Sequence, residues 1–170
     1  MPSVDPNLCI KVPVVIGQNS CEVMVVTQVP LVPPLFEIKD ISEDVSVDNC
    51  LVQNGLVIVN GTLHKDINYK TLDGSVQPFD GGQIATGTVV HTTVWLPFHC
   101  FIDVANALEG DDCQIESATV IGEKDEPKDP NDGDPTFNTL LEKAVIRIVA
   151  KVTRTEQLTV SATQPGVCPT

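Results

Sequence analysis

The sequence predicts an all-β protein: a β-sandwich or partly open barrel of short antiparallel strands, with flexible terminal arms. Three observations lead to this fold class. Apolar and polar residues alternate with a period of two along most of the chain, and valine is abundant in the alternating runs. Turn residues separate these runs, and no run has the period of an amphipathic helix.

The chain is expected to form one domain with two loose ends. We expect an N-terminal arm over residues 1–12, a single β domain over residues 13–160 and a C-terminal tail over residues 161–170. A chain of 170 residues can bury a sizeable core without help from metals. Disulfides are therefore not required merely for folding.

In the first half of the chain, CEVMVVTQV is a weakly alternating run. Asn54-Gly55 is a strong hairpin signal, which joins a strand near Leu51 to one that begins at Leu56. The run LVIVNGTLHKDINY then alternates clearly and predicts a strand with one wet face. Its inward residues are Val57, Val59, Leu63, Ile67 and Tyr69.

In the second half, PFDGGQIATG is expected to be an extended loop, and VWLPFHCFIDV a strand in which Pro97 indicates an edge position or a bulge. CQIESATVI is a weaker strand, residues 125–135 (DEPKDPNDGDP) an acidic loop, and AVIRIVAKVTRT a strand. The expected inward residues of the two clear strands are Val94, Leu96, Phe98, Cys100, Ile102, Val104, Ile146, Ile148, Ala150 and Val152.

The formal net charge is −13, which excludes polyanionic partners. We therefore expect no binding to nucleic acid or to an anionic membrane surface. No apolar run is long enough to span a bilayer, and the N-terminus lacks the basic start and apolar stretch of a secretion signal. We therefore expect the protein to be made in a cytosol and not to insert into a membrane.

Six cysteines are unusual in a chain made in a reducing cytosol. None lies in a C-x-x-C pair, so zinc-ribbon and thioredoxin-like motifs are excluded. Cys100 is expected to be buried as a small hydrophobe. Cys9 and Cys168 lie in the polar ends and are candidates for disulfides between subunits, whereas Cys21, Cys50 and Cys113 are further disulfide candidates. Six cysteines allow fifteen complete pairings, so the connectivity stays open.

Catalysis finds little support. His99 and Cys100 are adjacent on a strand and point to opposite faces, so a nucleophile pair would need His64 or His91 to reach Cys100 from another strand. No cofactor, no catalytic residue and no enzymatic activity are expected.

Metal binding is also not expected. The histidines lack the short spacing of metal ligands. The acidic loop is expected to be a solvated turn; the alternative is a calcium site, although the loop lacks the glycine and glutamate of an EF-hand. Its candidate ligands are Asp129, Asn131, Asp132 and Asp134.

The strand residues themselves resemble a known family. VIVNGTLHKDINY, followed after a loop by LPFHCFIDV, is similar to the SPOCS domain of endospore-forming bacteria, in which a V-x-G-T-L-H-K-x-I-x-Y strand precedes a P-F-x-x-F-I/V-D strand. The resemblance covers about residues 9–159. It implies a β-rich, non-enzymatic module that is made in the mother-cell cytoplasm and deposited on the spore surface, in the coat, the exosporium or an appendage.

Together with the terminal cysteines, this resemblance implies a structural, self-assembling subunit of a spore surface layer or appendage fibre. Copies would join through β-edges and through disulfides that form once the mother cell lyses, and other spore coat proteins are further possible partners. The alternative is a non-polymerising morphogenetic adaptor that binds another coat protein. Relatives often carry a C-terminal LysM module, which this sequence does not contain.

Overall fold

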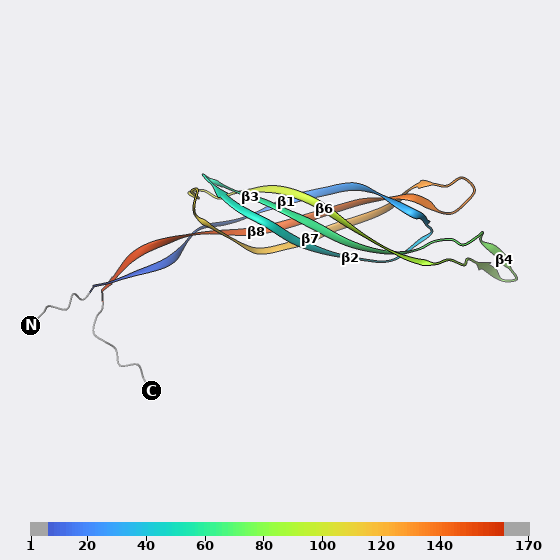
Figure 1. Cartoon of the computed structure of the whole chain (residues 1–170), viewed down its shortest axis with the longest axis horizontal. Coiled ribbons are helices and arrows are strands. Elements are labelled where there is room, and N and C mark those ends of the chain that lie inside the picture. Colours follow the sequence, from blue (N-terminus) through green and yellow to red (C-terminus); the bar gives the residue numbers. More distant parts are fainter. Residues whose placement is uncertain (1–6, 162–170) are drawn as a thin grey trace, which may run out of the picture.

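Two three-stranded antiparallel sheets face each other and form the body of the protein (Figure 1). The computed structural model describes residues 7–161, which contain eight strands and no helix. Sheet A has the order β1-β8-β7 and sheet B the order β2-β3-β6, while β4 and β5 form a small separate hairpin. The strands are β1 (Asn7–Leu35), β2 (Glu37–Gln53), β3 (Leu56–Lys70), β4 (Gln77–Phe79), β5 (Gly82–Ile84), β6 (Val89–Asp103), β7 (Asp112–Pro130) and β8 (Phe137–Ser161).

The core lies between the two sheets and contains the residues that the alternation of apolar and polar residues predicted to point inward. The predicted inward residues of β3 and β8 have no exposed surface, and those of β6 lie toward the same core. Gly61 on β3 makes room for Phe98 on β6, because a Cβ atom at Gly61 would lie 2.4 Å from the Phe98 ring. The all-β class is therefore confirmed, with open sheets rather than a closed barrel.

The strands differ from the prediction in length. β1 spans 29 residues and β8 spans 25, so these are long strands, not short ones. Residues 7–12 belong to β1 and pair with residues 156–161 of β8, so the strand runs without a break through the proposed domain boundary at residue 12. The domain boundaries themselves stay a prediction, and the remainder of both proposed ends lies outside the described residues.

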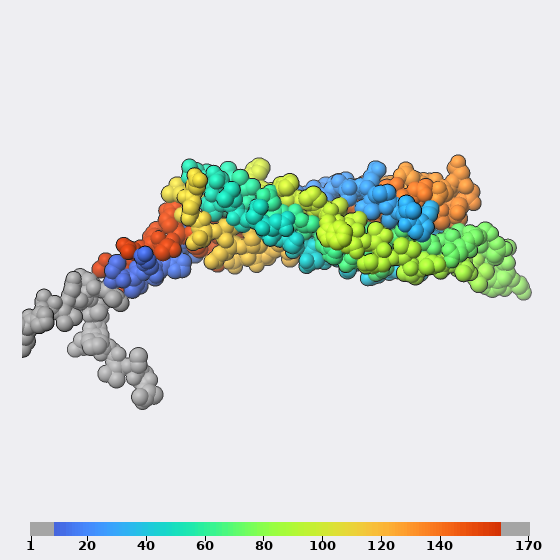
Figure 2. Space-filling model, in the orientation of Figure 1, coloured from blue at the N-terminus to red at the C-terminus, as the bar shows by residue number. Residues whose placement is uncertain are grey.

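β1 and β8 continue as a two-stranded ribbon beyond the end of the sandwich (Figures 1 and 2). β7 begins at Asp112, opposite Thr153, so residues 154–161 of β8 have only β1 as a strand partner. We call residues 7–14 and 154–161 the terminal ribbon. At the opposite end of the molecule lie the β4–β5 hairpin and the turn between β7 and β8 (Figure 1).

Two predicted loops contain strands. Residues 125–130 of the acidic segment form the end of β7, and only residues 131–136 form a turn. Proline is tolerated there because β7 is an edge strand, whose outer N–H groups need no partner in the sheet. The segment PFDGGQIATG contains the β4–β5 hairpin. The predicted Asn54-Gly55 hairpin is confirmed, and Pro97 lies on the edge strand β6.

No helix that could cross a membrane occurs within residues 7–161.

Candidate functional site

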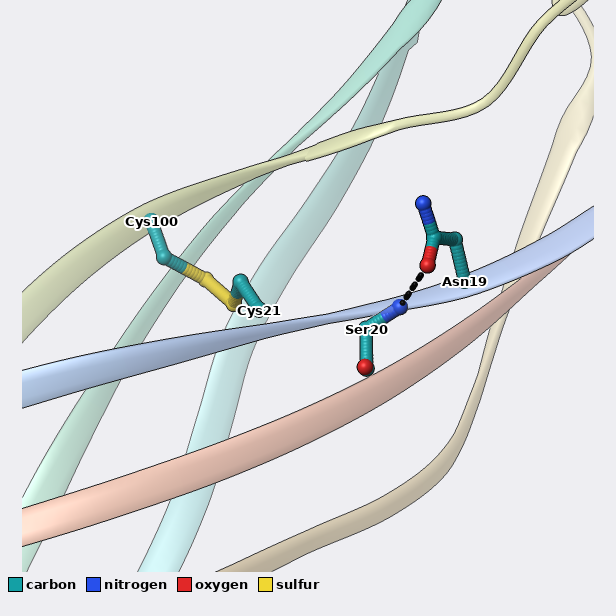
Figure 3. The surroundings of a disulfide bond; sticks show 4 residues. All are labelled: Asn19, Ser20, Cys21 and Cys100. Carbon is teal, nitrogen blue, oxygen red and sulfur yellow. Dashed lines mark hydrogen bonds between the residues drawn. A yellow bond between two sulfur atoms is a disulfide. The ribbon is translucent and has the colours of Figure 1, made fainter.

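Four of the six cysteines form two disulfides that join the sheets. Cys21 on β1 bonds to Cys100 on β6, with the two Cα atoms 6.6 Å apart (Figure 3). Cys50 on β2 bonds to Cys113 on β7, with a Cα separation of 6.0 Å. Both separations lie within the range that a disulfide spans. Each bond links an edge strand of sheet A to the edge strand of sheet B that faces it.

The two disulfides close the two long sides of the sandwich at nearly the same level. Val59 at the centre of sheet B lies opposite Cys50 on one side and opposite Cys100 on the other. We call the two long sides the seams: β1 meets β6 at one seam, and β2 meets β7 at the other. One disulfide therefore fastens each seam.

Cys100 differs from the expected buried thiol. It is half-buried, and its sulfur is bonded to Cys21. The side chain of Cys100 points toward the other sheet, as the alternation of its strand predicted. The pattern of one strand cannot show that a second cysteine lies opposite it on the other sheet. Because the Cys100 sulfur is in a disulfide, Cys100 has no thiol that a histidine could activate. His64, His91 and His99 lie on the outer face of sheet B, where His99 contacts Asn60 at 2.7 Å.

Cys9 is an exposed free cysteine in the terminal ribbon. It lies opposite Thr159, close to the end of the described part of β8. Cys168, the second candidate for a bond between subunits, lies outside the described residues. The disulfides within the chain thus leave Cys9 and Cys168 as the two candidates that the sequence had already singled out.

One face of the terminal ribbon carries an apolar stripe. Ile10, Val12 and Val14 of β1 point to this face, as do Leu158 and Val160 of β8, which are 43% and 44% exposed. Arg154 and Glu156, the partners of Val14 and Val12, share the face at the end nearer the sandwich, so its apolar part lies toward the tip of the ribbon. This face continues the inward face of sheet A, and the β1–β8 ribbon extends past the end of sheet B (Figure 1). Both long edges of the ribbon lack strand partners among the described residues.

A second group of polar residues surrounds Lys65 and extends from the buried Glu142 to Glu123 at the exposed margin of the sandwich. Lys65 on β3 points inward and has no exposed surface. Its ammonium donates hydrogen bonds to Glu123 at 2.6 Å, to Asp125 at 3.0 Å and to Glu142. Glu123 and Asp125 come from β7 and Glu142 from β8, so these bonds link the two sheets. Glu43 on β2 adds a fourth carboxylate nearby.

The charges in this group shift one another's pKa values. Burial alone would lower the pKa of Lys65, but the hydrogen bonds to Glu123, Glu142 and Asp125 outweigh it and raise the pKa above its ordinary value. Burial raises the pKa of Asp125, and the neighbouring Glu142 adds to this effect. Burial, followed by repulsion from Glu123, raises the pKa of Glu43. We call these five residues the Lys65 cluster.

Sequence reasoning missed the Lys65 cluster, although one signal was present. Lys65 has the same odd-numbered parity as Leu63 and Ile67, so a charged side chain stood at an inward position of a clearly alternating strand. A lysine at such a position needs carboxylate partners inside the protein. Those partners could not be identified, because Glu123 and Glu142 are 58 and 77 residues away along the chain.

The acidic turn does not gather its carboxylates into a site. Within residues 7–161, the acidic group that could hold a metal ion consists of Glu123, Asp125 and Glu142. None of the proposed turn ligands belongs to this group. Asn131 instead binds the hydroxyl of Thr136 at 2.9 Å through its side-chain amide.

The β3 and β6 motifs correspond to a recognised family. A model of the family described as "SipL, SPOCS domain" matches residues 35–120, just over half of the chain. This range includes Lys65 and the cysteines at positions 50, 100 and 113. The chain is also 23% identical to "Exosporium protein C" of Clostridium sporogenes (strain ATCC 15579), over 92% of this chain and 77% of that protein. No solved structure gives a significant match. The chain therefore belongs to the SipL, SPOCS domain family.

Proposed function

We propose that this protein is a structural subunit of the spore surface, made in the mother-cell cytoplasm, that joins other copies of itself through the terminal ribbon. The family and the similarity to a protein named for the exosporium support the location. A structural role, not a catalytic one, agrees with the use of four cysteines to fasten the fold. The main observation in support of self-assembly is that Cys9 is exposed on a ribbon whose edges have no strand partner among the described residues.

Open strand edges favour assembly because their N–H and C=O groups can pair with a strand of a neighbour. The apolar stripe adds surface that is removed from water when a second ribbon covers it. The distribution of charge also favours contact through the terminal ribbon. The ribbon carries two basic side chains and one acidic one, in a chain whose net charge is −13. Two copies can therefore approach each other through their ribbons with less repulsion than through their bodies.

Oxidation then makes the contact durable. Cys9 of one copy would bond to Cys9 or Cys168 of another, with loss of two protons and two electrons to oxygen after the mother cell lyses. Dissociation of the copies then requires a reductant rather than dilution alone. A disulfide between subunits therefore suits a surface layer that must survive without a cytoplasm to maintain it.

Electron microscopy of purified protein tests self-assembly. Oxidised wild-type protein is expected to form extended particles or clusters, because ribbon contacts and Cys9 bonds act together. A Cys9→Ser variant is expected to assemble reversibly and to fall apart when it is diluted.

Particles that remain single copies at every concentration, oxidised or reduced, would contradict self-assembly. That result would favour the alternative, a non-polymerising adaptor whose ribbon accepts a strand of another coat protein.

A further inference from the structure

The two outer faces of the sandwich carry different charges. Five of the ten basic side chains of the chain lie on the outer face of sheet A, together with four acidic ones. The basic residues are Lys124, Lys128, Lys143, Arg147 and Lys151, and the acidic ones are Glu22, Asp112, Glu116 and Glu126. The outer face of sheet B carries two lysines, Lys39 and Lys70, and six acidic residues, Glu37, Asp40, Asp44, Asp48, Asp66 and Asp103. Sheet A therefore has a weakly positive outer face and sheet B a negative one.

On sheet A, three lysines share one glutamate. Lys124 on β7 and Lys143 on β8 are direct partners in the register, so two like charges lie opposite each other. The carboxylate of Glu126 lies 2.5 Å from the Lys124 ammonium and 3.2 Å from that of Lys128. Lys143 approaches the same carboxylate at 3.9 Å. Hydrogen bonds from Lys124 and Lys128 hold the pKa of Glu126 down to about 2, so it stays charged. We call these four residues the lysine patch, which keeps an excess of two positive charges.

On sheet B, three aspartates form the opposite arrangement. Asp66 on β3 lies in the register between Asp40 and Asp44 of β2, and all three project from the outer face. Asp66 lies 3.8 Å from His64 and 3.3 Å from His91. Among residues 7–161, no lysine or arginine forms a salt bridge with any of the three aspartates. We call the three aspartates the acid patch, whose negative charge has no permanent cation beside it in the same copy.

Large apolar side chains are exposed beside both patches. Val26 on β1, the register partner of Lys143, is 54% exposed, and Met24 on the same face is 65% exposed. Trp95 on β6 is 65% exposed and is the register partner of His64, which lies opposite Asp44 of the acid patch. Removing these side chains from water is favourable, and a tryptophan ring also attracts an ammonium group or a thioether. Each face therefore offers an apolar anchor next to its charges.

The two patches lie back to back at the same level of the sandwich. Lys65 on β3 is the neighbour of Asp66 and points inward. Its ammonium bonds across the core to Glu142, which is the neighbour of Lys143 on β8. The lysine patch and the acid patch are therefore separated by the thickness of the sandwich, with little offset along the strands. A second copy in the same orientation, displaced perpendicular to the sheets, would bring its acid patch over the lysine patch of the first.

We propose that copies of this protein stack face to face, with the lysine patch of one copy on the acid patch of the next. Contact between two different faces leaves one free face of each kind, so further copies can add on either side. Contact between two like faces would set charges of the same sign against each other. The stack goes beyond the ribbon contact of the proposed function and does not depend on it. Copies stacked in one orientation would carry their terminal ribbons on the same side, since the ribbon lies at one end of the sandwich (Figure 1).

Light scattering on a full-length parent variant with a disabled ribbon tests the stack. Cys9→Ser and Cys168→Ser remove the two candidate thiols for bonds between copies, and Leu158→Asp weakens the ribbon contact. This parent is expected to associate at about 0.02 M salt and to dissociate at about 0.5 M salt, because salt screens the charges between copies. The ribbon contact of the proposed function is measured separately at about 0.5 M salt, where stacking is suppressed, so the two contacts can fail independently.

Charge reversal on each face of the parent identifies the two surfaces. Lys124→Glu with Lys143→Glu makes the lysine patch negative, and Asp40→Lys with Asp44→Lys makes the acid patch positive. Each variant alone is expected to associate about tenfold more weakly than the parent, because its two faces then carry charge of the same sign. An equal mixture of the two variants is expected to recover association, since their patches are complementary again. Both variants keep a net negative charge, so attraction between whole molecules cannot produce this recovery.

Asp132→Lys with Asp134→Lys is the matched control, because it makes the same change in net charge in the turn between β7 and β8; it is expected to associate like the parent. A parent that stays a single copy at low salt would overturn the proposal. So would reversed variants that associate as well as the parent, a mixture that associates no better than its components, or an equal loss in the control. If a reversed variant fails to fold, Lys143→Gln and Asp44→Asn replace the pairs, and unchanged association in both would overturn the proposal.

Discussion

Lys65 shows how a single residue can tie two sheets together. It lies at an inward position between Leu63 and Ile67, where an apolar side chain would be expected. Its three hydrogen bonds cross the core to β7 and β8. A buried ion pair of this kind need not add stability over an apolar pair of the same volume. Removing one member, however, leaves the other charges buried without compensation.

Lys65→Met is therefore expected to destabilise the protein by about 3–5 kcal/mol, because three carboxylates lose their cation while the methionine fills the space. Denaturant unfolding of the oxidised protein measures this change. Lys124→Met is a matched control, since Lys124 is exposed and binds only a surface carboxylate. Its effect is expected to stay within about 1 kcal/mol. Equal stabilities for the two variants would show that the buried hydrogen bonds contribute nothing.

At the scale of the element, the terminal ribbon is the part of the fold that lacks support. An isolated two-stranded ribbon is only marginally stable in water, and three or more strands with a covered face are needed for independent stability. Residues 7–14 and 154–161 have neither a third strand nor an opposing sheet. A neighbouring copy that covers the apolar stripe would supply what the ribbon lacks.

Leu158→Asp is expected to weaken self-assembly at least tenfold while leaving the Tm of the sandwich nearly unchanged. The substitution places a charge on the stripe, and burying that charge between two copies is costly. Sedimentation or light scattering across a concentration series measures the effect. Ile121→Asp, at a position of β7 that is 44% exposed, adds the same charge outside the ribbon and serves as the control.

Equal assembly of both variants would place the contact elsewhere on the molecule. A large loss of Tm in Leu158→Asp would instead show that the ribbon is part of the folded core of a single copy.

The strands themselves were largely predictable, because one wet face and one buried face impose a period of two on the residues. This period located the cores of β3, β6 and β8, and Asn54-Gly55 located a hairpin. Strand lengths were less predictable. The ribbon and the end of β7 have no fully buried face, so their sequences resemble a polar arm and an acidic loop. Pairing across the sheets was not predictable, since it joins residues such as Cys21 and Cys100 that are 79 positions apart.

At the scale of the whole molecule, the protein is a sandwich fastened along both seams. The disulfides join residues 79 and 63 positions apart, and each such loop closure stabilises the fold by about 4 kcal/mol in the chain-entropy description. Four of the six cysteines are bonded to one another within the chain. Cys9 and Cys168 are therefore the cysteines that remain as candidates for a disulfide between copies. Cys9 lies on the terminal ribbon, which carries two basic side chains and one acidic one in a chain whose net charge is −13.

Disulfide mapping of mixed assemblies tests the central claim most directly. Equal amounts of unlabelled and nitrogen-15-labelled protein are reduced, mixed, allowed to assemble in air and digested under non-reducing conditions for mass spectrometry. Peptides that contain Cys9 are expected to be linked to Cys9 or Cys168 of another copy, so that half of the linked pairs combine one labelled with one unlabelled peptide. The Cys21–Cys100 and Cys50–Cys113 peptides serve as internal references, since they should never mix labels. A Cys9 that remains a free thiol in the assembled material, or that bonds only within its own chain, would contradict the claim.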